Sequence, residues 1–483
     1  MAHDVTPMRI GADRLTLGPD AVSVVRSPYD GSEIGRVPAG TEADIDTAVA
    51  AALERHRAGA LEPHERAAIL DRAAARLADP EVHERFARSI AREAAKPITT
   101  ARVEVTRAID TFRFSAATAR TMAGEMVPID ASSAAAGSGK LAFVLRVPVG
   151  VVGAISPFNF PLNLVVHKVA PAIAAGCPVV LKPASATPLT ALALADLLLD
   201  ECGLPAGWLN VVTCSGQVAD RLVTHDDVAL ITFTGSPPVG WSIRAKAPRK
   251  KVGLELGNNA PVIIEPDADL ASTAKKISVA GFSYAGQSCI SVQRVFVHAS
   301  VIDAFLAELV PLVDALRVGD PLDDDTDVSA LINEGETDRV RKAITAAVEA
   351  GASIATGGEV DDRGVLSPTV LTGVTPEMDV CATEIFGPVI GVAAYDDFED
   401  ALRLANDTRY GLQAAVFTAD LGKALRAART LDFGGVLVNE VPTWRADQMP
   451  YGGVRDSGNT REGPAYAAHE MTEPRLIVIQ PPG

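Results

Sequence analysis

Five short β-rich runs alternate with helix-like segments in the middle of the chain. They are VVGAI (151–155), PVVLK (178–182), LNVVT (209–213), ALITF (229–233) and VGLEL (252–256). Strands that are separated by helices predict crossover connections and therefore a parallel sheet. Ligands of open parallel sheets bind beyond the carboxyl ends of the strands, so we expect binding residues in the turns that follow these runs.

A second alternating region lies between Pro261 and Val438. Its candidate strands are PVIIE (261–265), QRVFVH (293–298), PTVLT (368–372), PVIGVAAY (388–395) and GVLVN (435–439). Helix-like segments separate these runs, which predicts a second α/β domain. The fold class expected for the chain is therefore α/β.

The region ahead of the first run is expected to be helical from residue 41 to residue 123. Thr41 is a good helix N-cap, and Pro63 and Pro80 each stand where a helix would begin. Proline is favoured at the first helical position because its missing N–H is not needed there. These signals predict an all-helical opening region.

An extended arm is expected after Gly124. The β-rich segments MVPIDA (126–131) and KLAFVLRVPVG (140–150) are separated by the small-residue stretch ASSAAAGSG (131–139), which predicts a hairpin leaving the main body. The last β-rich run, RLIVIQ (475–480), could complete a sheet with this arm. Such an arm often joins subunits.

Composition excludes several classes of protein. The 483 residues are enough for about three domains. With 44 Lys and Arg against 61 Asp and Glu, the net charge of −17 makes nucleic acid a poor partner. The N-terminus lacks a secretory h-region, and the apolar stretch 147–166 is interrupted by three prolines and two asparagines, so neither secretion nor a membrane span is expected. The five cysteines have no pairing rhythm or metal-ligand spacing, which favours reduced thiols in the cytoplasm and no metal site.

Three polar features could carry chemistry, and each has a plainer explanation. Cys289 lies in a Gly- and Ser-containing loop, yet a lone cysteine is more often a buried structural residue. Glu255 ends a predicted buried strand, where a carboxylate is costly unless it has a role or a salt bridge. The segment FTGSPPVG (233–240) combines a strand, a turn and a helix start that could bind phosphate, although its prolines could simply open the helix.

Seven segments together identify a family. They are PFNFPLN (157–163), LKPASATP (181–188), FTGS (233–236), LELGNNAP (254–261), GQSC (286–289), EIFGPV (384–389) and MPYGGVRDSG (449–458). In content and order they strongly resemble the aldehyde dehydrogenase superfamily. The resemblance covers nearly the whole chain, and it includes the separation of 34 residues between Glu255 and Cys289 (289 minus 255).

The resemblance implies a fold, a division into domains and an assembly. A Rossmann-like NAD(P)-binding domain would comprise residues 1–124 and 149–256, and an α/β catalytic domain residues 257–442. The oligomerisation arm and C-terminal segment would comprise residues 125–148 and 443–483. In the family these last two segments build a sheet between subunits, which implies a homodimer or homotetramer.

The resemblance also implies a reaction, in which a small aldehyde is oxidised to a carboxylic acid with NAD(P)+. The Cys289 thiolate would attack the carbonyl, and the Asn159 side chain with the Cys289 N–H would hold the oxyanion. Glu255 would activate the water that hydrolyses the thioester. The implied cofactor residues are Ser156, Pro157, Phe158, Lys182, Ser185, Gly235, Ser236, Glu384 and Phe386.

Two departures from the family pattern concern the cofactor. Asn258 stands where the family usually has a second glycine after the catalytic glutamate, which would add bulk beside the nicotinamide. Ser185 stands where many NAD-preferring relatives have glutamate. Because a glutamate there would repel the 2′-phosphate of NADP, the serine predicts that the enzyme accepts NADP as well as NAD and slightly favours NADP.

The substrate is expected to meet the segment NEVPTWRADQMPYGG (439–453), which resembles the lactaldehyde and phosphonoacetaldehyde dehydrogenase group. It places Trp444 and Arg445 beside the family's substrate tunnel, where Arg445 would meet an anionic tail or only pair with Asp447. Ser288 stands where relatives acting on phosphorylated glyceraldehyde can carry arginine. Two alternatives remain open: a CoA-acylating semialdehyde dehydrogenase, which Glu255 disfavours, and a non-catalytic structural homologue, which the intact catalytic set disfavours.

Overall fold

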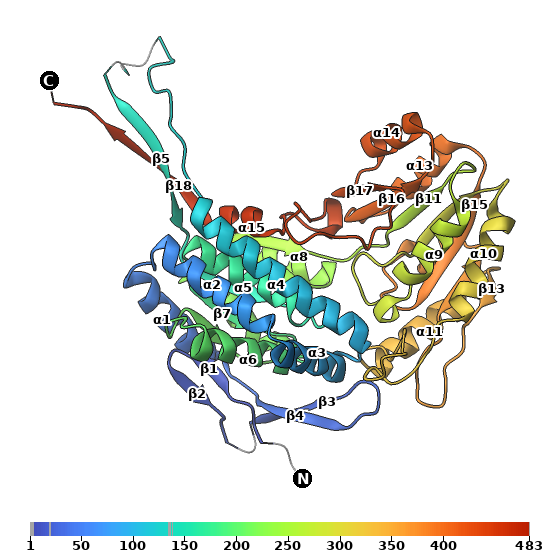
Figure 1. Cartoon of the computed structure of the whole chain (residues 1–483), viewed down its shortest axis with the longest axis horizontal. Coiled ribbons are helices and arrows are strands. Elements are labelled where there is room, and N and C mark those ends of the chain that lie inside the picture. The colour runs from blue at the N-terminus through green and yellow to red at the C-terminus, as the bar shows by residue number, and fades with distance from the viewer. Residues whose placement is uncertain (1–3, 19–20, 134–136, 138, 483) are drawn as a thin grey trace.

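Two seven-stranded sheets in two lobes dominate the computed structural model, which describes residues 4–18, 21–133, 137 and 139–482 (Figure 1). Blue and green segments form one lobe, and yellow and orange segments form the other. A two-stranded arm projects away from the first lobe. None of the helices in the described part of the chain combines the length and apolar character needed to cross a bilayer.

The first sheet has the strand order β10-β9-β6-β7-β8-β1-β2. Its strands are β10 (Lys251–Glu255), β9 (Val228–Thr234), β6 (Val151–Ile155), β7 (Val179–Lys182), β8 (Leu209–Val211), β1 (Met8–Ile10) and β2 (Asp13–Leu15). The first five are parallel, so the parallel sheet predicted from the five β-rich runs is confirmed. The antiparallel strands β1 and β2 were not predicted, because three residues are too few to show a period.

Helices and a small hairpin surround this sheet. The helices are α1 (Glu42–Arg57), α2 (Pro63–Leu77), α3 (Pro80–Ala94), α4 (Ile98–Thr121), α5 (Asn163–Ala175), α6 (Leu189–Asp196), η1 (Leu197–Glu201), α7 (Gly216–Thr224), α8 (Pro237–Lys246) and α15 (Pro464–Glu470), and the hairpin is β3 (Val22–Arg26) with β4 (Glu33–Pro38). The predicted helical opening region is confirmed by α1 to α4. Thr41 and Asp44 form a capping box at the start of α1, as the capping residue indicated.

The second sheet has the strand order β13-β14-β15-β12-β11-β16-β17. Its strands are β13 (Ser353–Thr356), β14 (Thr369–Thr372), β15 (Val389–Tyr395), β12 (Arg294–His298), β11 (Pro261–Ile264), β16 (Gln413–Phe417) and β17 (Gly435–Val438). All pairs are parallel except β13 with β14, and the five predicted strands are confirmed. The helical segments of this lobe are α9 (Leu270–Ala280), η2 (Ser283–Gly286), α10 (Ile302–Asp314), α11 (Glu334–Glu349), α12 (Asp379–Ala382), α13 (Phe398–Asn406), α14 (Leu421–Thr430) and η3 (Arg455–Ser457).

The arm is an antiparallel pair of β5 (Leu141–Pro148) and β18 (Thr472–Ile479). The predicted pairing of the C-terminal run with the arm is therefore confirmed (Figure 1). The segment 126–131, predicted as the other strand of a hairpin, forms only an isolated bridge from Met126 to Phe143. Part of the small-residue stretch 131–139, namely residues 134–136 and 138, lies outside the described residues. The domain boundaries expected from the sequence stay predictions.

Candidate active site

Two cavities meet at Cys289. The smaller, of about 250 Å³, lies between α4, α5, α9 and the loop that carries Arg445. The larger, of about 1060 Å³, lies at the carboxyl ends of β6, β7, β9 and β10. The residues common to both linings are Leu164, Thr234, Glu255, Leu256 and Cys289. A thiol and a carboxylate thus lie on the boundary between a small cavity and a large one.

Cys289 follows a tight turn that only an unusual backbone can form. Tyr284, Ala285 and Gly286 all have positive φ angles, of 52°, 52° and 69°. A Cβ on Gly286 would come within 2.1 Å of the Gly387 carbonyl oxygen, so the close approach of the two chains requires glycine. Burial raises the pKa of the Cys289 thiol, whereas a contact of 3.0 Å between its Sγ and the Tyr451 hydroxyl opposes that rise.

Asn159 lies in the turn between β6 and α5. Its Nδ2 donates to the Gln287 carbonyl at 3.0 Å, two residues before Cys289, and its Oδ1 has no partner among the described residues. The buried Glu104 carboxylate accepts from the Leu162 and Asn163 amides at 2.9 and 3.1 Å, which fixes the end of this turn. The amide that was predicted to hold an oxyanion is therefore held close to the thiol loop.

Glu255 ends β10, as predicted, and is 3% exposed. Neither carboxylate oxygen has a hydrogen-bond partner among the described residues. Burial raises the pKa of Glu255 well above its ordinary value, and the nearby Glu462 raises it further, against the opposing charges of Arg445 and Lys168. A buried carboxylate without partners is poised to exchange a proton with a ligand or a water molecule.

The large cavity is lined by all nine residues that were predicted to bind the cofactor: Ser156, Pro157, Phe158, Lys182, Ser185, Gly235, Ser236, Glu384 and Phe386. Ser236 is the N-cap of α8, and its side chain does not cap the helix. Lys182 Nζ donates to Ser185 Oγ at 3.3 Å, and Ser185 Oγ donates to the Cys214 carbonyl at 3.2 Å. Burial raises the pKa of Glu384 to about 7, and its Oε1 accepts from the Asn258 amide at 3.0 Å.

The bulk of Asn258 does not reach this cavity, contrary to the expectation from the sequence. Its side-chain Nδ2 donates to the Gln413 carbonyl at 3.0 Å, and the residue is absent from the cavity lining among the described residues. The neighbouring position 257 requires glycine, because a Cβ there would come within 2.0 Å of a Glu384 carboxylate oxygen.

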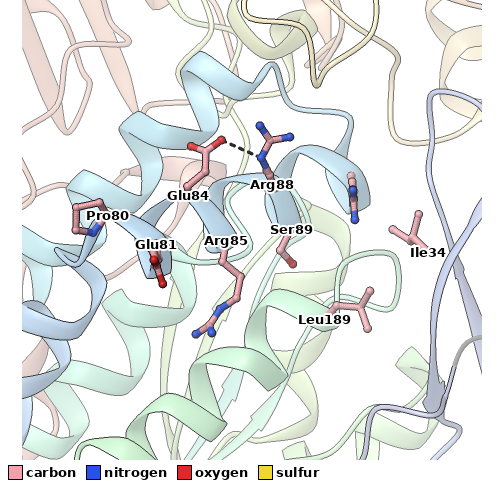
Figure 2. A pocket seen from close by; sticks show the side chains of 9 residues that line it. Ile34, Pro80, Glu81, Glu84, Arg85, Arg88, Ser89 and Leu189 are labelled. Atoms are coloured by element: carbon pink, nitrogen blue, oxygen red, sulfur yellow. Dashed lines mark ion pairs between the residues drawn. The ribbon is translucent and has the colours of Figure 1, made fainter.

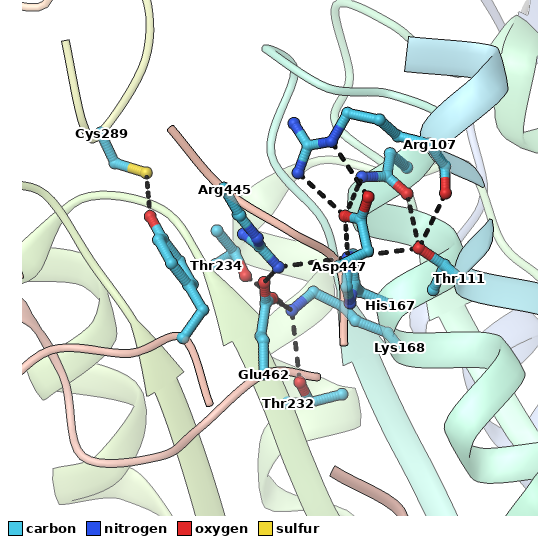
Figure 3. Close-up of polar contacts among 12 residues, drawn as sticks. Arg107, Thr111, His167, Lys168, Thr232, Thr234, Cys289, Arg445, Asp447 and Glu462 are labelled. Carbon is cyan, nitrogen blue, oxygen red and sulfur yellow. Dashed lines mark hydrogen bonds and ion pairs between the residues drawn. The ribbon is translucent and has the colours of Figure 1, made fainter. Parts of the chain in front are cut away.

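Arg445 does not pair with Asp447, which corrects one of the two expectations for its side chain. Its Nη2 donates to Glu462 Oε2 at 2.9 Å and lies 3.1 Å from His167 Nε2 (Figure 3). Asp447 instead accepts from Arg107 at 2.8 and 3.1 Å and lies 2.9 Å from His167 Nε2. Arg445 lines the small cavity, whereas Trp444, which was also predicted there, is 53% exposed and does not line it.

Sequence reasoning missed three residues of the site. Arg107 comes from α4, far from every motif, Glu462 follows the last motif, and Tyr451 lies inside the motif MPYGGVRDSG but was given no role. The one available hint was the tyrosine before the two glycines in MPYGG, because its hydroxyl can form a hydrogen bond and an apolar side chain cannot. Side chains that meet only through the tertiary fold carry no local pattern.

Another hollow, of about 740 Å³, lies between α3, Ile34 of β4 and Leu189 at the start of α6 (Figure 2). Its lining includes Arg85, Arg88 and Ser89, and Arg88 pairs with Glu84 at 2.9 Å. It shares no lining residue with the two cavities at Cys289.

Comparison with known proteins identifies relatives over most of the chain. Residues 19–477 match the aldehyde dehydrogenase family. A 3-sulfolactaldehyde dehydrogenase of Priestia aryabhattai is 45% identical, with 94% of each chain covered. Aldehyde dehydrogenase 21 of Physcomitrella patens, solved in complex with the reaction product succinate, is 38% identical with a TM-score of 0.93 and 99% of each chain covered. A glyceraldehyde-3-phosphate dehydrogenase of Methanocaldococcus jannaschii, solved with NADP, is 39% identical with a TM-score of 0.90, covering 95% of this chain and 99% of that one.

Proposed function

The chain belongs to the aldehyde dehydrogenase family, and on that premise we propose that Cys289, Glu255 and Asn159 are its catalytic residues. The enzyme oxidises a small aldehyde to the carboxylic acid with a nicotinamide cofactor. One observation carries the assignment: Cys289 and Glu255 lie on the boundary between a small cavity and a large one. An aldehyde in the small cavity and a cofactor in the large one would meet only there.

Cys289 is proposed as the nucleophile. Its sulfur forms a bond to the aldehyde carbon, and the carbonyl electron pair moves onto oxygen. The Asn159 amide, which is already within hydrogen-bond distance of the thiol loop, donates to that oxygen together with the Cys289 N–H. Preorganised donors of this kind stabilise the developing charge without reorganising during the reaction.

Glu255 is proposed as the general base. Its oxygens are buried and free of hydrogen bonds among the described residues, so the carboxylate can accept a proton from a water that attacks the thioester. The raised pKa of Glu255, caused first by burial and then by Glu462, makes it a stronger base than an ordinary glutamate. Thiolate then leaves, and the carboxylic acid is released.

The large cavity fits a nicotinamide cofactor. The α8 N-terminus with its uncapped Ser236 suits a pyrophosphate. Lys182 is a buried ammonium that has no carboxylate partner among the described residues, and burial lowers its pKa, so an anionic or hydroxyl-bearing ligand beside it would favour its charged form. Glu384 and Phe386 line the end of the cavity toward Cys289, where they would hold the ribose and the ring. When bound there, the cofactor supplies a hydride acceptor.

NADP is proposed to be used at least as well as NAD. Ser185 lies 3.3 Å from Lys182 Nζ, so the position holds a hydroxyl and an ammonium but no carboxylate. A 2′-phosphate would gain a charge-assisted hydrogen bond there. One relative of similar fold was solved with NADP, which agrees with the proposal.

The substrate is proposed to be a short aldehyde that carries an anionic group. The small cavity has about 250 Å³ and is lined by Arg107 and Arg445. Asp447 binds Arg107 through Nε and Nη2, so Nη1 has no partner among the described residues. The names of the relatives include a sulfonated aldehyde and the dicarboxylate succinate, which are both small and anionic. A panel of hydroxy-, carboxy-, phosphono- and sulfonated aldehydes compared by kcat/KM tests this, and a preference for the neutral members would contradict it.

We further propose a homodimer or homotetramer in the cytoplasm. The arm exposes apolar side chains, including Leu145 and Leu476 at 46% and 53%, which a partner subunit would cover. All five cysteines are free, as in a reducing compartment.

The experiment that tests the catalytic assignment is Cys289→Ala. The variant should lose aldehyde-dependent formation of reduced cofactor and keep cofactor binding, because the large cavity keeps its other lining residues. Appreciable aldehyde oxidation by Cys289→Ala would overturn the nucleophile assignment.

A further inference from the structure

The Tyr451 hydroxyl lies against the sulfur of Cys289. The two atoms are 3.0 Å apart, and Figure 3 marks the contact that Cys289 makes. Tyr451 is 3% exposed, and its hydroxyl has no other hydrogen-bond partner among the described residues. A buried hydroxyl with a single neighbour directs its proton toward that neighbour whenever the neighbour is an anion.

The ring of Tyr451 is fixed from two sides. Its amide and carbonyl form an antiparallel bridge with Glu462, at N–O distances of 3.2 and 2.6 Å. The Arg445 guanidinium carbon lies 3.8 Å from the ring centroid, and Arg445 is itself held by Glu462. A guanidinium on the face of a phenol places positive charge beside the hydroxyl, and this makes the hydroxyl a better hydrogen-bond donor.

We propose that Tyr451 is a further catalytic residue, whose hydroxyl donates a hydrogen bond to the Cys289 thiolate. Arg445 acts through Tyr451 as a positioning residue. The inference rests on the proposed role of Cys289 as nucleophile.

The charges around Cys289 explain why such a donor is needed. Burial raises the pKa of the thiol, and the carboxylates of Glu384 and Glu255 raise it further. The groups that oppose this are the hydroxyl of Tyr451 and the charge of Arg445. The other charged groups around Glu255 are Glu462, Lys168 and Arg461, and Lys168 lies 3.8 Å from Glu462. Among the described residues, Tyr451 is the one side chain that can donate a hydrogen bond to the Cys289 sulfur.

The proton balance of the step is simple. The thiol proton leaves to solvent, the sulfur electron pair forms the bond to the carbonyl carbon, and the carbonyl pair moves to oxygen, so Glu255 stays ionised for the later attack of water. Tyr451 keeps its proton throughout. When the thioester is hydrolysed, thiolate returns as the leaving group, and the same hydrogen bond stabilises it.

Tyr451→Phe tests the proposal because it keeps the ring and removes only the hydroxyl. The readout is the pH dependence of Cys289 alkylation by iodoacetamide, followed by peptide mass spectrometry. A hydrogen bond to a charged group is strong enough to move a titration by about one to two pH units. We expect the midpoint of alkylation to rise by that amount in the variant, and kcat/KM to fall about tenfold or more at neutral pH.

Tyr395→Phe is the matched control. Tyr395 is also buried, and its hydroxyl lies 2.9 Å from the Ile264 carbonyl oxygen and 2.5 Å from Glu265 Oε1 in the second lobe, away from both cavities. The pH midpoint of Cys289 alkylation in Tyr395→Phe should equal that in the wild type. Should Tyr451→Phe fail to fold, Arg445→Lys serves as the second variant: it keeps the charge, loses the planar stack and should also raise the midpoint.

An unchanged midpoint in Tyr451→Phe would overturn the inference. This failure is distinct from failure of the proposed function, because alkylation measures the thiol without turnover. If Cys289→Ala retains aldehyde oxidation, the nucleophile assignment fails. If that variant is inactive while Tyr451→Phe titrates like the wild type, only the role of Tyr451 fails.

Discussion

The surroundings of Glu255 suit a role in hydrolysis of the thioester rather than in its formation. It is buried without hydrogen-bond partners among the described residues, and it lines both cavities, so it can reach a water beside Cys289. Glutamine at this position keeps the shape and removes the base. The variant therefore affects hydrolysis of the thioester more than its formation.

Glu255→Gln should give a rapid burst of reduced cofactor followed by a very slow steady state. The acyl group accumulates because no base activates the water. Stopped-flow absorbance of the reduced nicotinamide measures both phases. The steady-state rate of the wild type should rise with pH through a midpoint above the ordinary value for glutamate, since burial raises the pKa of Glu255. Near wild-type turnover in the variant would show that another group activates the water.

Ser185→Glu should shift cofactor preference toward NAD. A carboxylate about 4 Å from the 2′-phosphate would repel it by roughly 4 kcal/mol at an effective dielectric of about 20, before screening by salt. We expect the ratio of kcat/KM for NADP to that for NAD to fall at least about tenfold, or ~1.4 kcal/mol. Ser185→Ala is the matched control and should move the ratio far less. An unchanged ratio in Ser185→Glu would mean that residue 185 does not face the ribose 2′ position.

Helices α4 and α5 and the loop after β17 are joined by polar contacts on Asp447. Arg107 of α4 and His167 of α5 both contact its carboxylate, and Asn163 Nδ2 donates to it at 3.0 Å (Figure 3). Burial raises the pKa of Asp447, but the His167 hydrogen bond and the charge of Arg107 outweigh burial and hold it well below the ordinary value. These contacts fix one wall of the small cavity.

Asp447→Asn should destabilise the fold, because it leaves the Arg107 charge without its partner. Breaking a buried pair on one side costs about 3 kcal/mol. A lower Tm by calorimetry at neutral pH checks this, with the exposed pair variant Asp338→Asn as control. A group with a lowered pKa stabilises the fold above its ordinary value of 3.8, and that stability is lost as the pH falls below it. Equal Tm values for wild type and Asp447→Asn at neutral pH would refute the role of Asp447.

At the scale of elements, the sequence predicted those strands that have both a period and helical neighbours. The strand β6 has the bounds of its predicted run, and the ends of β7, β8, β9 and β10 differ from theirs by at most two residues. The strand β16 was missed, because its sequence QAAVF is rich in alanine and has no alternation. The turn at residues 284–286 was also missed, since two of its positive φ angles belong to Tyr and Ala, which seldom adopt them.

At the scale of the site, the cavity-lining residues that the sequence indicated are those that lie inside or beside the motifs. Cys289, Glu255 and all nine cofactor residues lie on the cavity walls. Arg107, Tyr451 and Glu462 could not be predicted, because their roles depend on distances between α4, α5 and the C-terminal loop. Arg445 lines the small cavity, and its ionic partner is Glu462, 17 residues away in sequence, rather than the nearby Asp447 that was one of the two expectations.

The whole molecule carries an arm whose apolar side chains are exposed in a single chain. Leu145, Leu476 and Val478 are 46%, 53% and 47% exposed. Residues 125–127 bond to part of the outer edge of β5, whereas β18 has a free edge among the described residues. Unpaired strand edges with apolar side chains favour pairing with another chain. We therefore expect the arm to act in the assembly of subunits rather than in catalysis.

The wild type should sediment as a dimer or tetramer at micromolar concentration. Leu476→Glu should shift the distribution toward smaller species, because it places a charge on the surface that a partner would cover. Val348→Glu, a change at a 40% exposed apolar position on α11, is the control and should leave the distribution unchanged. An active wild-type monomer at that concentration would contradict the proposed assembly.

The most direct test of the whole account is the covalent state of Cys289 during turnover. Glu255→Gln is mixed with succinic semialdehyde and NADP, and the protein is analysed by intact mass and peptide mass spectrometry. The account predicts one acyl group per chain, located on Cys289 and absent when Cys289 is also replaced by Ala. Formation of reduced cofactor with no adduct on Cys289, or with an adduct on another residue, would contradict it.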